Sequence, residues 1–190
     1  MFLNGHFDFP IKIYFTFFSQ DSAVSYTHNS RKKDEMVKDK KITVFGASGL
    51  VGSSIVRAAL SKGYKVNGTM RNHNSILKSK VLKSLPNGEA LKLFSADMSD
   101  YDTLEDPLKN SDAIFITCLV PTYFGFDGTP AKELDVNRGY REIVLPTVNG
   151  ALNILRQAKR KNIKNVVICS STSSTNPIPA VAVKNEIDHW

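Results

Sequence analysis

A glycine-rich turn between a strand-like run and a helical pattern is the feature that most restricts the fold of this chain. Lys41–Phe45 is short, apolar and rich in β-branched residues, which favours a β-strand. The next residues, Gly46-Ala47-Ser48-Gly49-Leu50-Val51-Gly52, carry glycines at a spacing of three and lead into a helix-like segment. A strand, a glycine turn, a helix and a second strand make a βαβ unit, whose two strands run parallel.

The rest of the body repeats this alternation of strands and helices. Strands are expected over Lys41–Phe45, Tyr64–Met70, Leu91–Ser95, Ala113–Cys118 and Asn165–Cys169, and helices over 51–62, Ser75–Ser84, Tyr101–Leu108 and Gly139–Lys161. Pro146 is expected to kink the last helix or to mark its start. The pattern predicts an α/β fold: a Rossmann-type doubly wound parallel sheet in strand order 3-2-1-4-5, with helices on both faces.

Apolar periodicity indicates which side of two of these helices is buried. The expected buried face is formed by Val51, Ile55, Ala58 and Ala59 in the first helix and by Leu145, Val148, Leu152 and Leu155 in the last. Both faces are expected to pack on the central sheet.

The glycine turn has the chemistry of a phosphate-binding loop. Gly46 allows a sharp turn off the strand, Gly49 allows close approach of a pyrophosphate, and Gly52 allows the helix to pack on the sheet. The following helix N-terminus presents free N–H groups and a partial positive charge. The segment from Gly46 to Gly52, which includes Ala47, Ser48, Leu50 and Val51, is therefore predicted to bind a dinucleotide.

The end of the second strand indicates which dinucleotide is bound. An Asp or Glu there would accept from the ribose 2′-hydroxyl of NAD, but this chain has Gly68-Thr69-Met70-Arg71. Arg71 is suited to pair with the 2′-phosphate of NADP. The sequence predicts NADP(H) in preference to NAD(H), and a solvated loop arginine is the alternative.

Two further strand ends are predicted to line the same cleft. Asp97 and Met98 follow the third strand, where the carboxylate either meets an adenine amino group or caps a turn. Thr117 and Cys118 end the fourth strand and are expected to wall the cleft, with Cys118 as a small buried residue rather than a reactive thiol.

Four segments together resemble a known family: Gly46-x-x-Gly49-x-x-Gly52, Ala96-Asp97-Met98, Pro146–Leu155 and Asn165–Ser171. They are similar to the extended short-chain dehydrogenase/reductases, in the NAD(P)-dependent epimerase/dehydratase family. The likeness is greatest to the dihydroflavonol reductase and cinnamoyl-CoA reductase branch, and it runs from about Lys40 to the end. It implies an NADPH-dependent reductase of a ketone or aldehyde, with Ser171 as the catalytic hydroxyl and Thr172 as a neighbour that can substitute for it.

The family's Tyr-x-x-x-Lys pair is absent, because none of the six tyrosines is followed four positions later by Lys. The resemblance places that pair and the substrate lobe beyond Trp190, so this chain is expected to be a cofactor-binding fragment that is inactive alone. A non-catalytic NADP(H)-binding sensor or interaction module is one alternative, and a sugar-nucleotide epimerase or dehydratase is another.

The first forty residues differ in composition from the body. Seven of the seventeen Phe and Tyr residues fall between Phe2 and Phe18, and a polar run follows. Neither a secretory leader nor a transit peptide fits this composition. Residues 1–40 are predicted to be a poorly ordered extension, with an added strand near Phe15 or a natural start at Met36 as alternatives. Residues 41–190 are predicted to be the NAD(P)-binding domain.

Composition excludes several classes of protein. The 25 Lys and Arg residues against 18 Asp and Glu residues give a net charge of +7, but the basic residues are dispersed along the sequence and no aromatic side chains alternate with them, so no specific nucleic-acid partner is expected. No transmembrane segment is predicted. Two distant cysteines and four scattered histidines show no metal-ligand spacing, so no metal site is expected. Cytoplasmic localisation is predicted, and homo-oligomerisation stays open.

Overall fold

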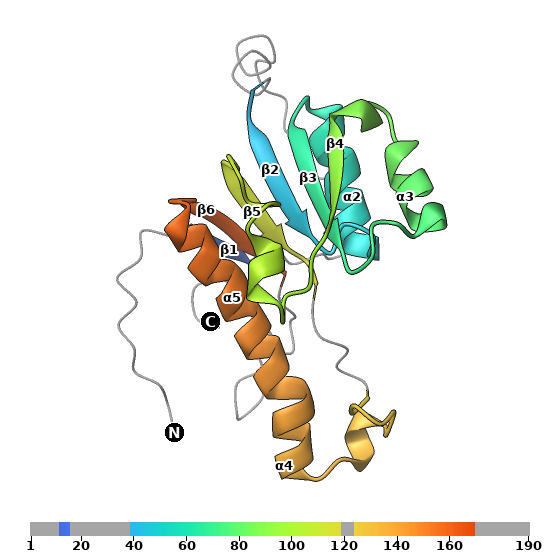
Figure 1. The fold of residues 1–190 in the computed structure, drawn as a ribbon, viewed down its shortest axis with the longest axis vertical. Coiled ribbons are helices and arrows are strands. Elements are labelled where there is room, and N and C mark those ends of the chain that lie inside the picture. The colour runs from blue at the N-terminus through green and yellow to red at the C-terminus, as the bar shows by residue number, and fades with distance from the viewer. Residues whose placement is uncertain (1–11, 16–38, 119–123, 170–190) are drawn as a thin grey trace, which may run out of the picture.

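A parallel sheet with helices on both faces forms the body of the protein (Figure 1). The computed structural model describes residues 12–15, 39–118 and 124–169. The strands are β1 Lys12–Phe15, β2 Lys41–Phe45, β3 Lys65–Met70, β4 Leu91–Ser95, β5 Ala113–Ile116 and β6 Asn165–Ile168. The α-helices are α2 Leu50–Ser61, α3 Ile76–Lys83, α4 Val136–Gly139 and α5 Leu145–Arg160. Shorter helices span Gly88–Ala90, Tyr101–Leu104 and Ala131–Glu133 (3-10) and Tyr140–Val144 (π).

The strand order confirms the predicted topology. Strands β4-β3-β2-β5-β6 are neighbours in this order and all pair in parallel, which is the predicted order 3-2-1-4-5. A sixth strand, β1, adds to the edge of β6, with Lys12 opposite Asn165 and Phe15 opposite Ile168. This strand comes from the predicted N-terminal extension; residues 1–11 and 16–38 of that extension lie outside the described residues.

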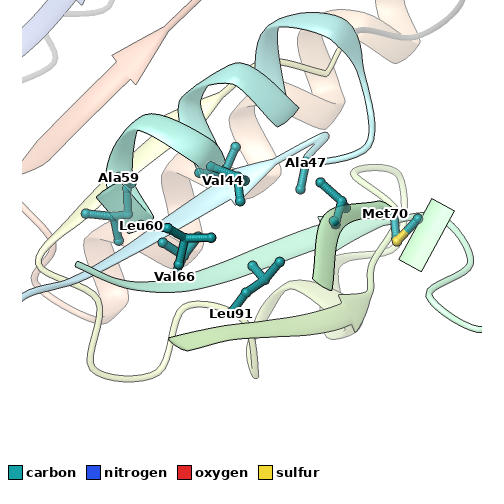
Figure 2. Close-up of a cluster of buried hydrophobic side chains, with 10 residues drawn as sticks. Val44, Ala47, Ala59, Leu60, Val66, Met70 and Leu91 are labelled. Carbon is teal, nitrogen blue, oxygen red and sulfur yellow. The ribbon is translucent and has the colours of Figure 1, made fainter. Parts of the chain in front are cut away.

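Two apolar clusters occupy the two faces of the sheet. Figure 2 shows the first, in which α2 lies over β2, β3 and β4 and side chains such as Val44, Leu60 and Val66 interdigitate. The second lies under α5 and includes Phe45 and Ile154. Val44 and Phe45 enter opposite clusters because successive side chains of a strand point to opposite faces. This arrangement confirms the prediction of helices on both faces.

The buried faces of the two long helices differ from the predicted ones. The residues that α2 buries are Gly52, Val56, Ala59 and Leu60, and those that α5 buries are Gly150, Ile154, Gln157 and Ala158. Of the predicted residues, Ala59 is buried, Ile55 and Leu155 are partly buried and pack against the two apolar clusters, and Leu145 and Val148 are exposed. Small residues at the contact allow each helix to approach its neighbours closely, and this closeness decides the orientation of the helix. None of the helices in the described ranges is long and apolar enough to cross a bilayer.

Pro146 lies in the first turn of α5, directly after the π-helical turn Tyr140–Val144. Proline has no N–H, and its ring crowds the carbonyl of the residue four positions earlier, here Glu142. The regular hydrogen-bond ladder therefore cannot continue unchanged through this point, and a wider turn precedes the proline. Pro146 therefore lies at the start of the regular α-helix α5, although helical backbone already precedes it from Val136.

Candidate cofactor-binding site

A cleft of about 590 Å³ lies where β2, β3, β4 and β5 end. Parallel strands bring their carboxyl ends to one edge of the sheet, so segments far apart in the chain meet there. The lining residues are Phe45, Gly46, Ser48, Gly49, Thr69, Met70, Arg71, Ala96, Asp97, Met98, Ser99, Thr117, Cys118, Phe126 and Pro146. The cleft is thus at the position where doubly wound sheets bind their ligands.

The glycine turn forms the floor of the cleft and is held by backbone hydrogen bonds. Gly46 has a φ of +83°, a left-handed conformation that strongly favours glycine. The N–H of Ala47 donates to the carbonyl of Thr69 at 2.9 Å, and the N–H of Gly49 donates to the carbonyl of Gly46 at 3.0 Å. The turn is therefore tied to β3 on one side and closed on itself on the other.

Helix α2 packs directly onto this turn. A Cβ at Gly52 would lie 2.1 Å from the carbonyl oxygen of Gly46 and 2.9 Å from Oγ1 of Thr117. The N-cap residue Gly49 supplies no side-chain hydrogen bond, and the first turn of α2 has no acidic residue. The N-terminal N–H groups of α2 and its partial positive charge are therefore available to a phosphate group beside Gly49.

The end of β3 offers a cation in place of the carboxylate that binds a ribose hydroxyl. Arg71 is exposed and lies at the rim of the cleft. The side chain of the buried residue Thr69 is directed to the glycine turn, where its Oγ1 accepts from the N–H of Gly46 at 3.4 Å. The Oγ of Ser95, at the end of β4, accepts a hydrogen bond from the backbone N–H of His73 and forms a second one with Nδ1 of the His73 ring. The rim around Arg71 is therefore polar and suited to a phosphate.

Asp97 lies in the cleft and also caps a turn. Its Oδ1 accepts from the backbone N–H of Ser99 at 2.9 Å and from the Ser99 hydroxyl at 2.6 Å. These hydrogen bonds, helped by the charge of Arg71, lower the pKa of Asp97 below its ordinary value. Asp97 can cap this turn and still have room to accept from an adenine amino group, because a carboxylate accepts several hydrogen bonds at once. The two alternatives from the sequence are therefore compatible.

We expect the Ser99→Ala change to raise the pKa of Asp97 towards its ordinary value, because the change removes the hydroxyl donor. Ionised Asp97 stabilises the fold above the ordinary carboxyl range, and this contribution is lost as the pH falls through the lowered pKa. The free energy of unfolding of Ser99→Ala should therefore change less between neutral and acid pH than that of the parent chain. Carboxyl-carbon NMR titration, with Ser84→Ala as the control, checks this; an unchanged Asp97 titration contradicts it.

The wall beside the turn is built by the residues that follow β5. The hydroxyl of Thr117 donates to the carbonyl of Phe45 at 2.7 Å, which joins the ends of β5 and β2. Cys118 is close enough that a Cβ at Gly46 would lie 2.9 Å from its Cβ. Burial raises the pKa of the Cys118 thiol to about 11, so the thiol stays protonated and unreactive at neutral pH.

The structure brings most of the predicted binding residues to this one cleft. The predicted residues that line it are Gly46, Ser48, Gly49, Arg71, Asp97, Met98, Thr117 and Cys118. The other predicted residues do not line it: Ala47 and Gly52 are buried, Val51 is half-buried and Leu50 is exposed. Ser171 and Thr172 lie outside the described residues.

The lining residues that were not predicted are Phe45, Thr69, Met70, Ala96, Ser99, Phe126 and Pro146. Thr69 and Ser99 are neighbours of predicted residues, and each carries a hydroxyl whose position at a strand end was a usable signal. Phe126 and Pro146 come from the long connection between β5 and β6, where no local pattern indicates contact with the glycine turn. Only the path of the folded chain places them there.

Sequence comparison finds relatives among NAD(P)-dependent reductases. The model of the NmrA-like family matches residues 38–127. Dihydroflavonol 4-reductase of Arabidopsis thaliana is 33% identical over 144 residues, which are 74% of this chain and 35% of that relative. Anthocyanidin reductase of the same plant is 28% identical over 154 residues, 80% of this chain and 42% of that relative. The chain thus spans less than half the length of these curated relatives.

Solved structures share the fold. Yeast methylglyoxal/isovaleraldehyde reductase complexed with NADPH matches with a TM-score of 0.56 at 24% identity, over 73% of this chain and 39% of that one. UDP-glucose 4-epimerase of Bifidobacterium longum, in complex with NAD⁺ and UDP, matches with a TM-score of 0.57 at 18% identity, over 71% and 38% of the two chains. Both neighbours carry nicotinamide dinucleotides, one with and one without the 2′-phosphate.

Proposed function

Because the chain belongs to the superfamily of NAD(P)-dependent epimerases and reductases, we propose that its cleft binds NADP(H) in the service of an NADPH-dependent carbonyl reductase. The observation that carries the proposal is the pairing of two features at one cleft. A glycine turn faces the uncapped N-terminus of α2, and Arg71 replaces the acidic residue at the end of β3.

The residues present fit such a cofactor from end to end. The N–H groups at the start of α2 would hold the pyrophosphate, because Gly49 and Ser48 leave them open to the cleft. Arg71 would pair with the 2′-phosphate, and Asp97 would accept from the adenine amino group. Thr117 and Cys118 would wall the remaining part of the cleft. The thiol of Cys118 and the methyl group of Thr117 would give that part of the cleft an apolar wall.

The cofactor, when bound, would supply a hydride to the carbonyl carbon of a ketone or aldehyde. We propose Ser171 as the hydroxyl that donates a hydrogen bond to the carbonyl oxygen, with Thr172 as its substitute. The described part of β6, which ends at Ile168, supports this proposal because it directs the chain towards the cleft edge: the N–H of Cys169 donates to the carbonyl of Ile116 beside Thr117.

Nucleotide titration tests the proposal. Purified chain is titrated with NADPH and with NADH while nicotinamide fluorescence is followed, and reduced nicotinamide mononucleotide serves as the control without adenosine. We expect saturable binding of NADPH, weaker binding of NADH and little binding of the mononucleotide, since pyrophosphate and adenosine contacts provide most of the affinity. Failure of both dinucleotides to bind would overturn the proposal.

Turnover assays separate the reductase from the epimerase. Consumption of NADPH in the presence of an aldehyde or ketone supports the reductase. Binding without consumption is expected both of a cofactor-binding fragment and of a non-catalytic NADP(H)-binding sensor or interaction module, so it does not separate these two. Conversion of a sugar nucleotide without net oxidation of NADPH supports the epimerase, for which the fold shared with an NAD⁺-containing epimerase is the motivating observation.

A further inference from the structure

The segment that contains β2, α2, β3 and α3 has an excess of basic residues, of which Lys40 and Lys65 form ion pairs with Asp112 and Asp39. Residues 40 to 88 hold no Asp or Glu, and their nine basic residues are Lys40, Lys41, Arg57, Lys62, Lys65, Arg71, Lys78, Lys80 and Lys83. Although these residues are spread along the sequence, α2 and α3 follow successive strands of the sheet and lie on the same side of it (Figure 1). The Nδ2 of Asn87 donates to the carbonyl of Leu60 at 3.0 Å, which joins the C-terminal ends of the two helices.

Helix α3 exposes apolar side chains where a surface helix normally has polar ones. Leu82 is buried against the core, whereas Ile76, Leu77 and Val81 are 83%, 74% and 58% exposed. Leu77 and Val81 are four positions apart and so lie on one side of the helix, away from the core. An ordinary amphipathic surface helix has the opposite distribution, with its apolar stripe turned inwards.

Three lysines surround these apolar side chains. Lys78, Lys80 and Lys83 are exposed, and no carboxylate among the described residues forms an ion pair with them. None of the residues of α3 lines the nucleotide cleft. The helix therefore presents an outward surface of mixed apolar and cationic character that the cofactor site does not use. We call Ile76, Leu77, Val81, Lys78, Lys80 and Lys83 the α3 patch.

We propose that the α3 patch binds the surface of a membrane that contains anionic lipids. Apolar side chains on an interfacial helix enter the boundary between headgroups and acyl chains. The lysines extend their aliphatic stems along that boundary and hold their ammonium groups at the anionic headgroups. In Figure 1, α3 lies at the outer side of the molecule beyond β4, away from α5.

The same features disfavour a nucleic acid as the partner. Single-stranded nucleic acids are bound by aromatic side chains that stack on bases, in a groove that follows the phosphates. The exposed aromatic side chains of the described residues, Phe124, Phe126 and Tyr140, belong to the segment after β5 and not to α3. Exposed Leu and Ile would gain nothing on a phosphate backbone, whereas they lose contact with water in a bilayer.

Vesicle co-sedimentation tests the proposal on the full chain. Vesicles of phosphatidylcholine alone are compared with vesicles in which phosphatidylserine is added, at low and high salt. We expect binding only with phosphatidylserine, weakened by salt. Lys78→Gln/Lys80→Gln/Lys83→Gln should reduce this binding by about 100-fold, since each lysine near an anionic surface contributes roughly fivefold. Lys132→Gln/Arg141→Gln/Lys164→Gln removes equal charge from other exposed sites and should bind as the parent chain does.

A second variant separates a membrane from other polyanions. Ile76→Gln/Leu77→Gln/Val81→Gln keeps all charges, and we expect it to lose vesicle binding while its binding to a DNA duplex stays unchanged. Thermal unfolding confirms that each variant is folded. Equal binding to both kinds of vesicle overturns the proposal, as does retention of binding by the α3 lysine variant. Binding to DNA but not to vesicles overturns it in favour of a nucleic-acid partner.

Discussion

Gly52→Ala should lower the free energy of unfolding by about 3 kcal/mol and remove nucleotide binding. The added Cβ would lie 2.1 Å from the carbonyl oxygen of Gly46, and both groups belong to the backbone of tightly packed segments. Relief of this contact requires α2 to move away from the turn, which displaces the N-terminal N–H groups from the phosphate position. Urea unfolding and NADPH titration of the same sample measure the two effects together.

Gly139→Ala is the matched control for this change. Gly139 has a helical backbone with a φ of −55°, and a Cβ there would meet nothing within 4 Å. Alanine is favoured over glycine in a helix by about 0.5 to 1 kcal/mol, so stability should stay equal or rise slightly. If Gly52→Ala behaves like Gly139→Ala, the close packing of α2 on the glycine turn is not what holds the cleft open.

Arg71→Ala should raise the Kd for NADPH by roughly 10-fold to 100-fold and leave the Kd for NADH nearly unchanged. A hydrogen-bonded ion pair between arginine and phosphate contributes about 1.5 to 3 kcal/mol, and only NADPH carries the 2′-phosphate. Arg71 is at the rim of the cleft, and its charge contributes to the lowered pKa of Asp97. Fluorescence titration with both nucleotides measures the ratio of the two affinities.

Arg57→Ala provides the control for the change in net charge. Arg57 is exposed on α2, away from the residues that line the cleft. Loss of this charge should weaken the binding of NADPH and NADH slightly and equally, because Arg57 acts on them only through the long-range electrostatic field of the protein. Equal loss of NADPH and NADH affinity in Arg71→Ala would contradict the role of Arg71 as the 2′-phosphate ligand and would leave the cofactor preference to other residues.

The prediction of the fold succeeded because its signals are local. A β-branched run followed by three spaced glycines restricts the backbone at Gly46 to a conformation that few other residues adopt, and its φ of +83° bears this out. The alternation of strands and helices then leaves few topologies, since crossovers between parallel strands are right-handed. The strand order β4-β3-β2-β5-β6 is one of these topologies.

The prediction of the helix faces held for Ile55, Ala59 and Leu155 and was wrong for Leu145 and Val148, for a physical reason. The pattern of large apolar residues predicted that α5 buries Leu145 and Val148, but the buried residues of the helix include Gly150 and Ala158. A Cβ at Gly150 would lie 2.5 Å from Cε of Met98, so this face fits closely against the segment after β4. Close packing of this kind stabilises the fold. The apolar periodicity of α5 carries no information about the shape of the segment against which the helix packs.

The sequence by itself determined the class of fold, the phosphate-binding turn and the strand ends that supply Arg71, Asp97 and Thr117 to one edge. These depend on backbone conformation and strand direction, which neighbouring residues control. Only the tertiary structure decided that Phe126 and Pro146 complete the cleft and that α2 and the lysine-bearing helix α3 share one side of the sheet. Such contacts join residues distant in sequence, and they arise from how helices and connections pack on the finished sheet.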